Sequence, residues 1–437
     1  MKKTFLLPLM LLALFATALS SCLEDKCDNS MTYTRWTPVY KTDAEIRTPP
    51  QYQAARPLKN TGKIYFYDKY ILINELKEGI HVLDNSNPSV PQNVGFIAIA
   101  GNVDMAVKGN FLYADNYMDL ITVDISTITN PRLTCRSEAV FATTFWRDPQ
   151  RGWFVDYLPE KVTESFDCND PSLIDYGYGW YRSGNSVFDM SSSGKSSGAS
   201  TGVFNTNGGS TGATPAGVGG SFARFTFNAN NFYAIDRAQL KTFTLNRLDC
   251  PALVATTQVA WNIETIFPYK DKLFIGSTTG MFIYNVANPN APVLLSNFTH
   301  GLSCDPVVIE GETAFITLHS GTTCNGSLNQ LSIVDVKNLT APSLIKAYNM
   351  VSPKGLSVWD NMLYLCDDGL KIYDVTNKNA VDKNLKAHIT GFDTFDVIPY
   401  EFNQKRIVMV IGKDGFFQFD VTDPTKPKEL CKISVVK

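Results

Sequence analysis

A short pattern that recurs along the chain constrains its fold more than any other feature. Residues 282–295, FIYNVANPNAPVLL, join two strand-like runs through an Asn and two prolines. Related copies align on the residue before the turn, at Asp84, Asp124, Thr244, Asn285, Asp335, Asp374 and Asp420. The successive spacings are 40, 120, 41, 50, 39 and 46 residues, so all steps but one share a similar period. A period of this length indicates a repeat architecture in which each copy is one structural unit.

Each repeat has the composition of four antiparallel strands. In residues 355–389, the runs GLSVW, MLYLC, LKIYDV and NLKAHI are rich in aliphatic and aromatic residues and are separated by turns. Such runs favour pleated strands, and Asp-Asn and Asp-Gly sequences favour tight hairpins. We therefore predict an all-β fold, a β-propeller of about seven four-stranded blades with a long loop insertion between the second and third repeats. Two β-sandwich domains are the alternative, but sandwiches do not keep one period for so long.

The recurring Asp or Asn is interpreted as architectural. At the end of a third strand, its side chain can accept hydrogen bonds from the turn amide two residues on. Proline lacks the ladder donor, so the prolines stop the third strand from running into the fourth and protect the outer edge. These residues are not expected to take part in catalysis.

The N-terminus is typical of an exported protein. Lys2 and Lys3 precede an apolar run, Phe5 to Leu19, that is too short to span a membrane. The sequence Leu-Ser-Ser-Cys that ends at Cys22 resembles a bacterial lipobox. This predicts a signal peptide over residues 1–21 and acylation of Cys22, which would anchor the chain to a membrane.

The next residues bear on location and partners. The acidic cluster at 24–28 resembles the export signal of surface lipoproteins of Bacteroidota, so we expect an outer-membrane lipoprotein at the cell surface, with the periplasmic face as the alternative. Without the signal peptide, 37 basic residues stand against 42 acidic ones, a charge near −5. No basic tract is present, so nucleic acid is not an expected partner.

The repeats also resemble a known family. LITVDISTITNPRL (residues 120–133) and LSIVDVKNLTAPSL (residues 331–344) are similar to LVIVD repeats of bacterial β-propeller proteins. Together with the lipobox and the segment TYTRWTPVY (residues 32–40), they resemble the LVIVD-repeat lipoproteins of Bacteroidota. The resemblance covers residues 60–437, only partly across the insertion. It implies the fold and carries over no catalytic residue.

The insertion covers residues 136–220 within a propeller domain at 61–437. Its first part is aromatic and contains Trp146, Trp153 and Trp180, whereas residues 191–220 are mostly Ser, Gly, Thr and Ala and predict a flexible loop. The tryptophans either form a platform for sugar rings or a partner, or pack the insertion onto the propeller. Residues 22–60 are expected to be a tether with an edge strand, TYTRWTPVY, which could extend a blade.

Eight cysteines follow Cys22, and outside the cytoplasm disulfides are the default expectation. Cys304 precedes the first strand of its repeat and Cys324 follows the second. Pairing about Gly311 and Glu312 would bring these two together, so a Cys304–Cys324 disulfide is predicted. The sequence offers no pairing for the other six.

Signals for chemistry are weak. The four histidines have no metal-site spacing, and there is no phosphate loop or nucleophile elbow, so no cofactor, metal or catalytic residue is predicted. By alignment, the funnel mouth holds residues of both signs that could grip a polar ligand or could line a solvated channel. They are Asp104, Arg224, Glu264, Asp305, Lys354 and Asp393.

We therefore expect a lipid-anchored envelope β-propeller that serves as a non-catalytic binding or scaffolding module for a protein or glycan partner. The alternative is a glycan-processing enzyme with carboxylates such as Asp104 and Asp305 at the funnel mouth. Two carboxyl groups about 5–10 Å apart in a deep pocket would favour the enzyme. A third interpretation, a partner in an outer-membrane assembly, predicts an exposed apolar patch of several hundred Å².

Overall fold

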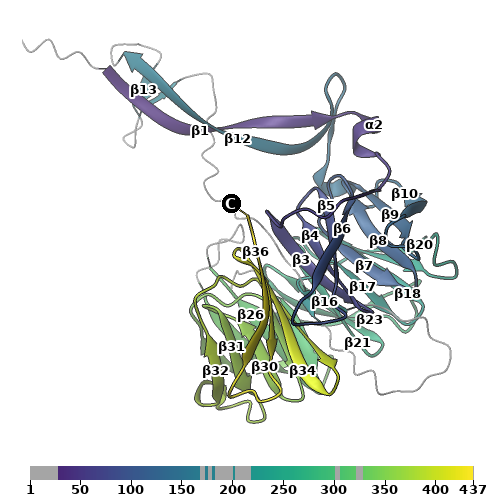
Figure 1. The fold of residues 1–437 in the computed structure, drawn as a ribbon, viewed down its shortest axis with the longest axis vertical. Helices are drawn as coiled ribbons and strands as arrows, with labels where there is room; N and C mark the ends of the chain where they lie inside the picture. Colours follow the sequence, from purple (N-terminus) through teal and green to yellow (C-terminus); the bar gives the residue numbers. More distant parts are fainter. Residues whose placement is uncertain are drawn as a thin grey trace, which may run out of the picture. The chain divides into compact units, whose positions relative to one another are not determined.

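The computed structural model describes residues 28–167, 173–175, 180–182, 200–201, 218–300, 306–320 and 328–436. The chain divides into two compact units. The larger unit is Tyr40–Val155 with Ser192–Lys437, and the smaller one is Met1–Val39 with Asp156–Ser191. Figure 1 shows both units and labels some of the elements of each.

The larger unit contains seven antiparallel four-stranded blades, each built from consecutive strands, so the prediction of a seven-bladed β-propeller is confirmed. The first strands are β3 (Thr61–Tyr67), β7 (Met105–Lys108), β17 (Phe225–Asn228), β21 (Ile263–Tyr269), β25 (Val307–Glu310), β29 (Leu356–Trp359) and β33 (Asp396–Phe402). The second strands are β4 (Tyr70–Glu75), β8 (Phe111–Asn116), β18 (Asn231–Asp236), β22 (Lys272–Ser277), β26 (Thr313–Leu318), β30 (Met362–Cys366) and β34 (Lys405–Gly412). The third strands are β5 (Gly79–Asp84), β9 (Asp119–Asp124), β19 (Gln239–Thr244), β23 (Gly280–Asn285), β27 (Gln330–Asp335), β31 (Leu370–Asp374) and β35 (Gly415–Asp420). The fourth strands are β6 (Gln92–Ala98), β10 (Arg132–Ser137), β20 (Ala252–Gln258), β24 (Val293–Thr299), β28 (Ser343–Asn349), β32 (Leu385–Ile389) and β36 (Lys428–Ser434).

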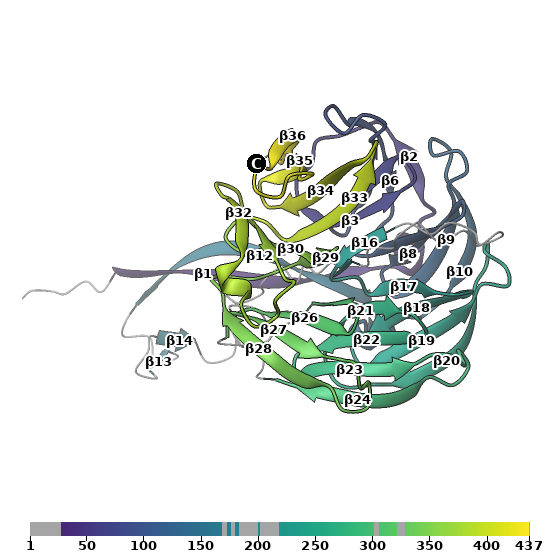
Figure 2. The same cartoon turned by 90° about the horizontal axis from the view of Figure 1, so that it is seen from below.

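The blades are arranged radially. First strands of successive blades contact one another at the centre, and the fourth strands lie outermost (Figure 2). Burial follows this order: β25 and β29 are almost wholly buried, whereas β20 and β24 contain only exposed and half-buried residues. Five apolar clusters join every pair of neighbouring blades, including the seventh with the first, because a four-stranded sheet can bury both faces only against its neighbours.

All seven anchor residues of the repeat end a third strand, as predicted. In six of them the side-chain oxygen accepts a hydrogen bond from the backbone amide two residues later. The pairs are Asp84–Ser86, Asp124–Ser126, Asn285–Ala287, Asp335–Lys337, Asp374–Thr376 and Asp420–Thr422. In four blades the hairpin before the third strand has a glycine with positive φ: at Gly369, for example, φ is +98° and a Cβ would lie 2.1 Å from the Ile389 carbonyl oxygen. The turn therefore has the architectural role that the sequence indicated.

The ring closes without a strand shared between its ends. A hydrogen-bonded group joins the first and seventh blades: Asn85 Nδ2 donates to the Tyr400 hydroxyl at 2.9 Å, and Gln418 Nε2 donates to Asn85 Oδ1 at 2.8 Å. The Val436 amide donates to the Leu58 carbonyl at 2.8 Å. Polar groups buried at this seam are thus paired, as burial requires.

The remaining elements belong to the N-terminal segment, the insertion and a late loop. They are β1 (Asp28–Lys41), α2 (Asp43–Ile46), β2 (Gln51–Gln53), the 3₁₀ helices η1 (Ala142–Thr144) and η2 (Val381–Lys383), β11 (Arg147–Asp148), β12 (Gly152–Asp167), β13 (Leu173–Asp175), β14 (Trp180–Arg182), β15 (Ser200–Thr201) and β16 (Val218–Ser221). The helix α2 starts with a capping box, in which Thr42 and Glu45 each accept the other's backbone amide.

The segment TYTRWTPVY lies in β1, which pairs with β12 of the insertion rather than with a blade. The strand that extends a blade is the following β2, which pairs with β6 at the outer edge of the first blade. In the smaller unit, the hydroxyls of Thr32 and Thr163 lie 2.9 Å apart across β1 and β12. The N-terminal segment and the insertion therefore form a sheet of their own.

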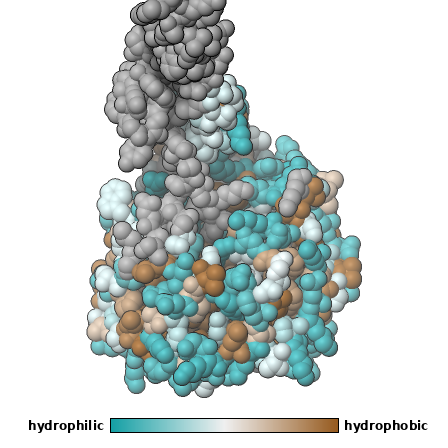
Figure 3. All heavy atoms as spheres, turned by 90° about the vertical axis from the view of Figure 1, so that its left-hand side faces the viewer, coloured by the Kyte–Doolittle hydropathy of each residue, from teal (hydrophilic) through white to brown (hydrophobic). Residues whose placement is uncertain are grey.

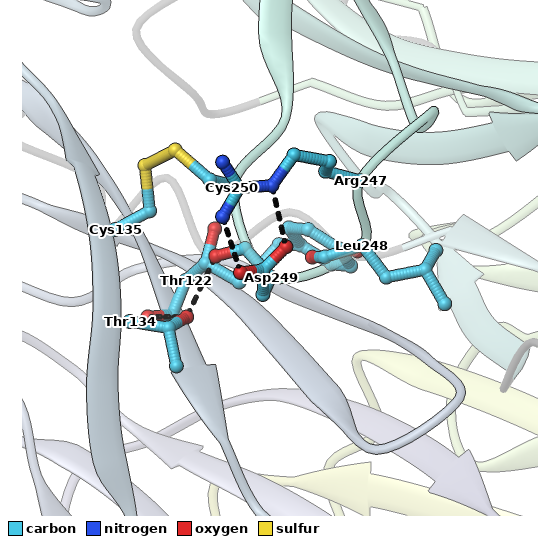
Figure 4. Close-up of a disulfide and its surroundings, with 8 residues drawn as sticks. Thr122, Thr134, Cys135, Arg247, Leu248, Asp249 and Cys250 are labelled. Carbon is cyan, nitrogen blue, oxygen red and sulfur yellow. Dashed lines mark hydrogen bonds and ion pairs between the residues drawn. A yellow bond between two sulfur atoms is a disulfide. The ribbon is translucent and has the colours of Figure 1, made fainter.

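A disulfide joins the second and third blades (Figure 4). Cys135 in β10 is bonded to Cys250 in the turn before β20, with Cα atoms 5.1 Å apart. Beside it, the Thr134 hydroxyl donates to the Asp249 carbonyl oxygen at 2.7 Å. The sequence had left both cysteines unassigned. The predicted Cys304–Cys324 pair lies outside the described residues.

Because this disulfide closes a separation of 115 residues, it limits the unfolded chain strongly. We expect a Cys135→Ser/Cys250→Ser double variant to lose about 2–4 kcal/mol of unfolding free energy, measured by denaturant titration. The difference from wild type should vanish under reducing conditions. A difference that persists after reduction would assign the loss to side-chain packing rather than to the cross-link.

Candidate functional site

Four of the candidate residues lie at one end of the propeller. Because consecutive strands are antiparallel, each first strand begins at the end where the second strand stops and the third starts. We call this end the mouth face. Asp104, Arg224, Lys354 and Asp393 all lie shortly before a first strand.

Asp104 and Arg224 are brought together in a buried ionic group with Lys63 and Asp115, here called the axial cluster. Lys63 Nζ donates to Asp104 Oδ2 at 2.5 Å, and the guanidinium of Arg224 donates to Asp115. The side chains of Lys63, Asp104 and Asp115 are at most 6% exposed. Burial raises the pKa of Asp115 and lowers that of Lys63. The cluster balances two cations against two carboxylates, the condition under which buried charge is tolerated.

The carboxylates of this cluster have little remaining capacity to bind a ligand. Asp104 also accepts from the backbone amides of Arg224 at 2.6 Å and Met105 at 2.7 Å. Asp115 Oδ1 accepts from the amides of Val103 at 2.7 Å and Asp104 at 2.9 Å. Lys63 and Asp115, which the sequence analysis missed, are needed to satisfy the predicted pair.

The centre of the ring is occupied by the chain itself. The strand β16 pairs with β3 and also contacts β29 and β33 (Figure 2). Its Ser221 donates through its backbone amide to Asp396 Oδ1 at 2.9 Å and accepts from the Leu356 amide at 2.7 Å. A Cβ on Gly220 would lie 1.5 Å from Asp396 Oδ2. The end of the Gly/Ser-rich insertion is therefore an ordered axial strand, which its composition did not predict.

A further carboxyl of this axial region with a perturbed pKa is Asp396. It is fully buried, and burial raises its pKa to about 7 against the opposing effect of the Ser221 donors and of Lys63. Its Oδ2 has no hydrogen-bond partner among the described residues. Few hydrogen-bond donors are available here to stabilise a carboxylate, so burial favours the neutral carboxyl.

Lys354 and Asp393 lie apart from the axis, at a cavity between the sixth and seventh blades. Lys354 Nζ donates to Asp393 Oδ1 at 2.5 Å, and Lys413 Nζ lies 2.9 Å from Asp393 Oδ2. The cavity measures about 450 Å³. Its lining includes Val351, Lys354, Asp368, Phe392, Asp393 and Asp414, and we call it the blade 6–7 cleft.

The tryptophans of the insertion divide by role. The Trp146 ring is stacked on Phe154 at 5.4 Å and meets the edge of Tyr40 at 5.6 Å, and the residue is 50% exposed. Trp153 Nε1 donates to Asp43 at 3.0 Å, so this residue packs the insertion against α2. Trp180 lies in β14, paired with Asp175.

The other predicted residues add little. Asp305 falls outside the described residues. Glu264 lies in β21, where burial raises its pKa to about 7. Within the described ranges, no three His, Cys, Asp or Glu side chains are grouped to hold a metal ion. No helix in the same ranges is long and apolar enough to cross a membrane.

Large apolar side chains do not gather on the visible surface of the propeller. On the face shown in Figure 3, hydrophobic residues are scattered among hydrophilic ones. The exposed aliphatic residues of the fourth strands occur singly or in adjacent pairs on five blades, at Val94, Leu253, Val254, Val293, Leu294, Leu344 and Leu385. On this face, the described residues do not form the apolar patch expected of an assembly partner.

Comparisons with known proteins identify the repeat. The LVIVD repeat family matches residues 100–137 and 326–350, around the third strands β9 and β27. The chain therefore carries LVIVD repeats. No curated protein matches it.

Several solved structures resemble the fold at low identity. The periplasmic gluconolactonase PpgL of Pseudomonas aeruginosa aligns over 86% of this chain and 96% of its own, with 10% identity and a TM-score of 0.49. PorZ, a surface component of the type-IX secretion system of Porphyromonas gingivalis, aligns over 88% of this chain and 39% of its own, with 10% identity and a TM-score of 0.46. BamB from Moraxella catarrhalis aligns over 80% and 81%, with 7% identity and a TM-score of 0.46. Likeness at this level carries no information about ligands or activity.

The raised pKa of Asp396 leads to a pH dependence. From about pH 4 to 7, the folded chain holds a proton that the unfolded chain has released, so the unfolding free energy falls as pH rises. Relative to Asp396→Asn, wild type should lose about 2 kcal/mol of unfolding free energy between about pH 5 and pH 7 and stay level above about pH 8. Denaturant titrations of both proteins at each pH measure the two unfolding free energies. The contributions of Glu264 and other titrating groups are the same in both proteins, so they cancel in the difference. Parallel curves would show that Asp396 is ionised throughout.

Proposed function

We propose that this chain is a lipid-anchored β-propeller of the cell envelope that acts as a non-catalytic binding or scaffolding module for a protein or glycan partner. The observation that supports this most is the filled axis. The strand β16 occupies the centre of the ring, and Asp104 is buried with its oxygens paired to Lys63, Arg224 and Met105.

At the axis, the alternative of a glycan-processing enzyme receives no such support. A glycosidase needs two carboxyl groups that face a substrate across a pocket. Asp104 instead faces groups of its own chain, and Asp396 is in contact with Ser221 of the axial strand. Binding chemistry that remains open to solvent lies away from the axis, at the blade 6–7 cleft and at the exposed ring of Trp146.

The proposed location is the outer membrane, at the cell surface, with acylated Cys22 as the anchor, as in the LVIVD-repeat lipoproteins of Bacteroidota. The support is the basic and apolar start of the chain and the Leu-Ser-Ser-Cys sequence that ends at Cys22. More than one acyl chain on this residue would make anchoring stable, since each buried methylene contributes about 0.8 kcal/mol.

A direct test of the binding role is a pull-down of the full-length protein from its native envelope, paired with a glycan array. We expect either a protein that co-purifies stably or a glycan that is bound and recovered intact. New reducing ends released from a bound glycan would contradict a non-catalytic role. Absence of both a protein and a glycan ligand would contradict the binding role itself.

Anchoring is tested separately. The Cys22→Ser variant should lose metabolically incorporated fatty acid and move from the membrane fraction to the wash, because the acylated thiol is gone. Cys431→Ser, which removes a cysteine far along the chain, is the control and should keep both label and location. Retention of the Cys22→Ser variant in the membrane fraction would contradict the proposed lipid anchor.

A further inference from the structure

The blade 6–7 cleft is a solvent-facing cavity formed by four segments of the mouth face. Val351 and Lys354 come from the loop before β29, and Asp368 from the turn before β31. Phe392 and Asp393 come from the loop before β33, and Asp414 from the turn before β35. Its volume of about 450 Å³ falls in the range of small-molecule sites, which are concave and few in a protein.

The charged groups at the centre of the cleft are already paired with one another. Asp393 bridges Lys354 and Lys413, one on each carboxylate oxygen. Burial raises the pKa of Asp393, but these two ammonium groups more than offset it, so the net pKa lies below its usual value. Lys354 also lies 5.3 Å from the centre of the Phe395 ring. An incoming cation would meet two ammonium groups here, and an incoming anion would meet Asp368 and Asp414.

Some polar groups of the blade 6–7 cleft can nevertheless still make hydrogen bonds to a ligand. Asp414 uses Oδ2 to accept the Asp393 amide at 2.8 Å, and no described residue donates to its Oδ1. The side chain of the exposed Asp368 likewise accepts from no described residue, since only its backbone carbonyl is bonded, to His388. Lys354 has ammonium protons beyond the one given to Asp393. The cleft thus presents both acceptors and a donor.

An apolar surface accompanies these polar groups. Phe392 is half-buried, and its ring is held against Phe417 at 4.5 Å and Phe419 at 5.8 Å. Val351, which also lines the cleft, is 61% exposed. A fixed aromatic ring beside paired charges is suited to a ligand with an apolar face and polar edges.

From these features we infer that the blade 6–7 cleft binds a neutral carbohydrate residue, whose hydroxyls donate to Asp368 and Asp414 and accept from Lys354 while its C–H face packs on Phe392. Hydroxyls both donate and accept, which matches the mixed lining better than a purely cationic or anionic group does. The inference rests on the proposed binding function and narrows its ligand class to glycans.

The test uses the full-length protein on an array of neutral, amino-sugar and uronic-acid oligosaccharides, followed by calorimetry with the best neutral binder. An Asp368→Asn/Asp414→Asn double variant should weaken that binding by about tenfold, because charge-assisted hydrogen bonds become neutral ones. Asn keeps an acceptor for the Asp393 amide and tolerates the φ of +54° at Asp368, so the fold should hold. Asp382→Asn, an exposed change on the same blade at its other end, is the matched control and should bind as wild type.

Four outcomes would overturn the inference. Unchanged affinity in the double variant, with unchanged thermal unfolding, would place the sugar elsewhere. A preference for amino-sugar or uronic-acid members would show that the cleft selects charge. If no oligosaccharide on the array binds but a protein co-purifies, the proposed binding function stands and a glycan ligand is ruled out. Loss of that protein in the double variant would make the cleft a protein site.

Discussion

The burial of blade faces is the constraint on which the rest of this structure depends. Each blade is a thin sheet that is apolar on both sides, so it is stable only between two neighbours. The last such contact, between the seventh blade and the first, uses no shared strand. It relies on an apolar cluster that includes Ile64 and Met409 and on the polar group formed by Asn85, Tyr400 and Gln418. Leu58 and Val436 then tie the two ends of the propeller chain together.

Closing the ring creates an axis that must itself be filled, and this determines the chemistry of the centre. The strand β16 fills it. This packing requires glycine at position 220, where a side chain would collide with Asp396, and it buries the carboxyl of Asp396. The same packing turns Asp104 and Arg224 into members of a satisfied ionic group. Residues that looked like ligand contacts in the alignment are therefore structural where they face the axis. Those that lie between two blades, such as Lys354 and Asp393, keep contact with solvent.

Prediction from sequence succeeded where the signal was local. The anchor residues Asp84 to Asp420 were assigned to strand ends because their hydrogen bonds reach only two residues along the chain. It offered no pairing for Cys135 and Cys250, since these two become neighbours only when the second and third blades pack side by side. It failed also for Lys63 and Asp115, which carry no motif and join Asp104 and Arg224 from different strands. Phe392 and Asp414 gave no signal either, because a cleft between blades has no signature within one blade.

The sequence by itself determined the repeat, the four strands in each copy, their turns and the place where the period fails, because each of these follows from residues close together in the chain. Only the tertiary structure decided which side chains meet across blades, that a Gly/Ser-rich segment ends as an axial strand, and that the open polar groups gather between the sixth and seventh blades. These depend on ring closure, which brings together residues as far apart as Asn85 and Gln418.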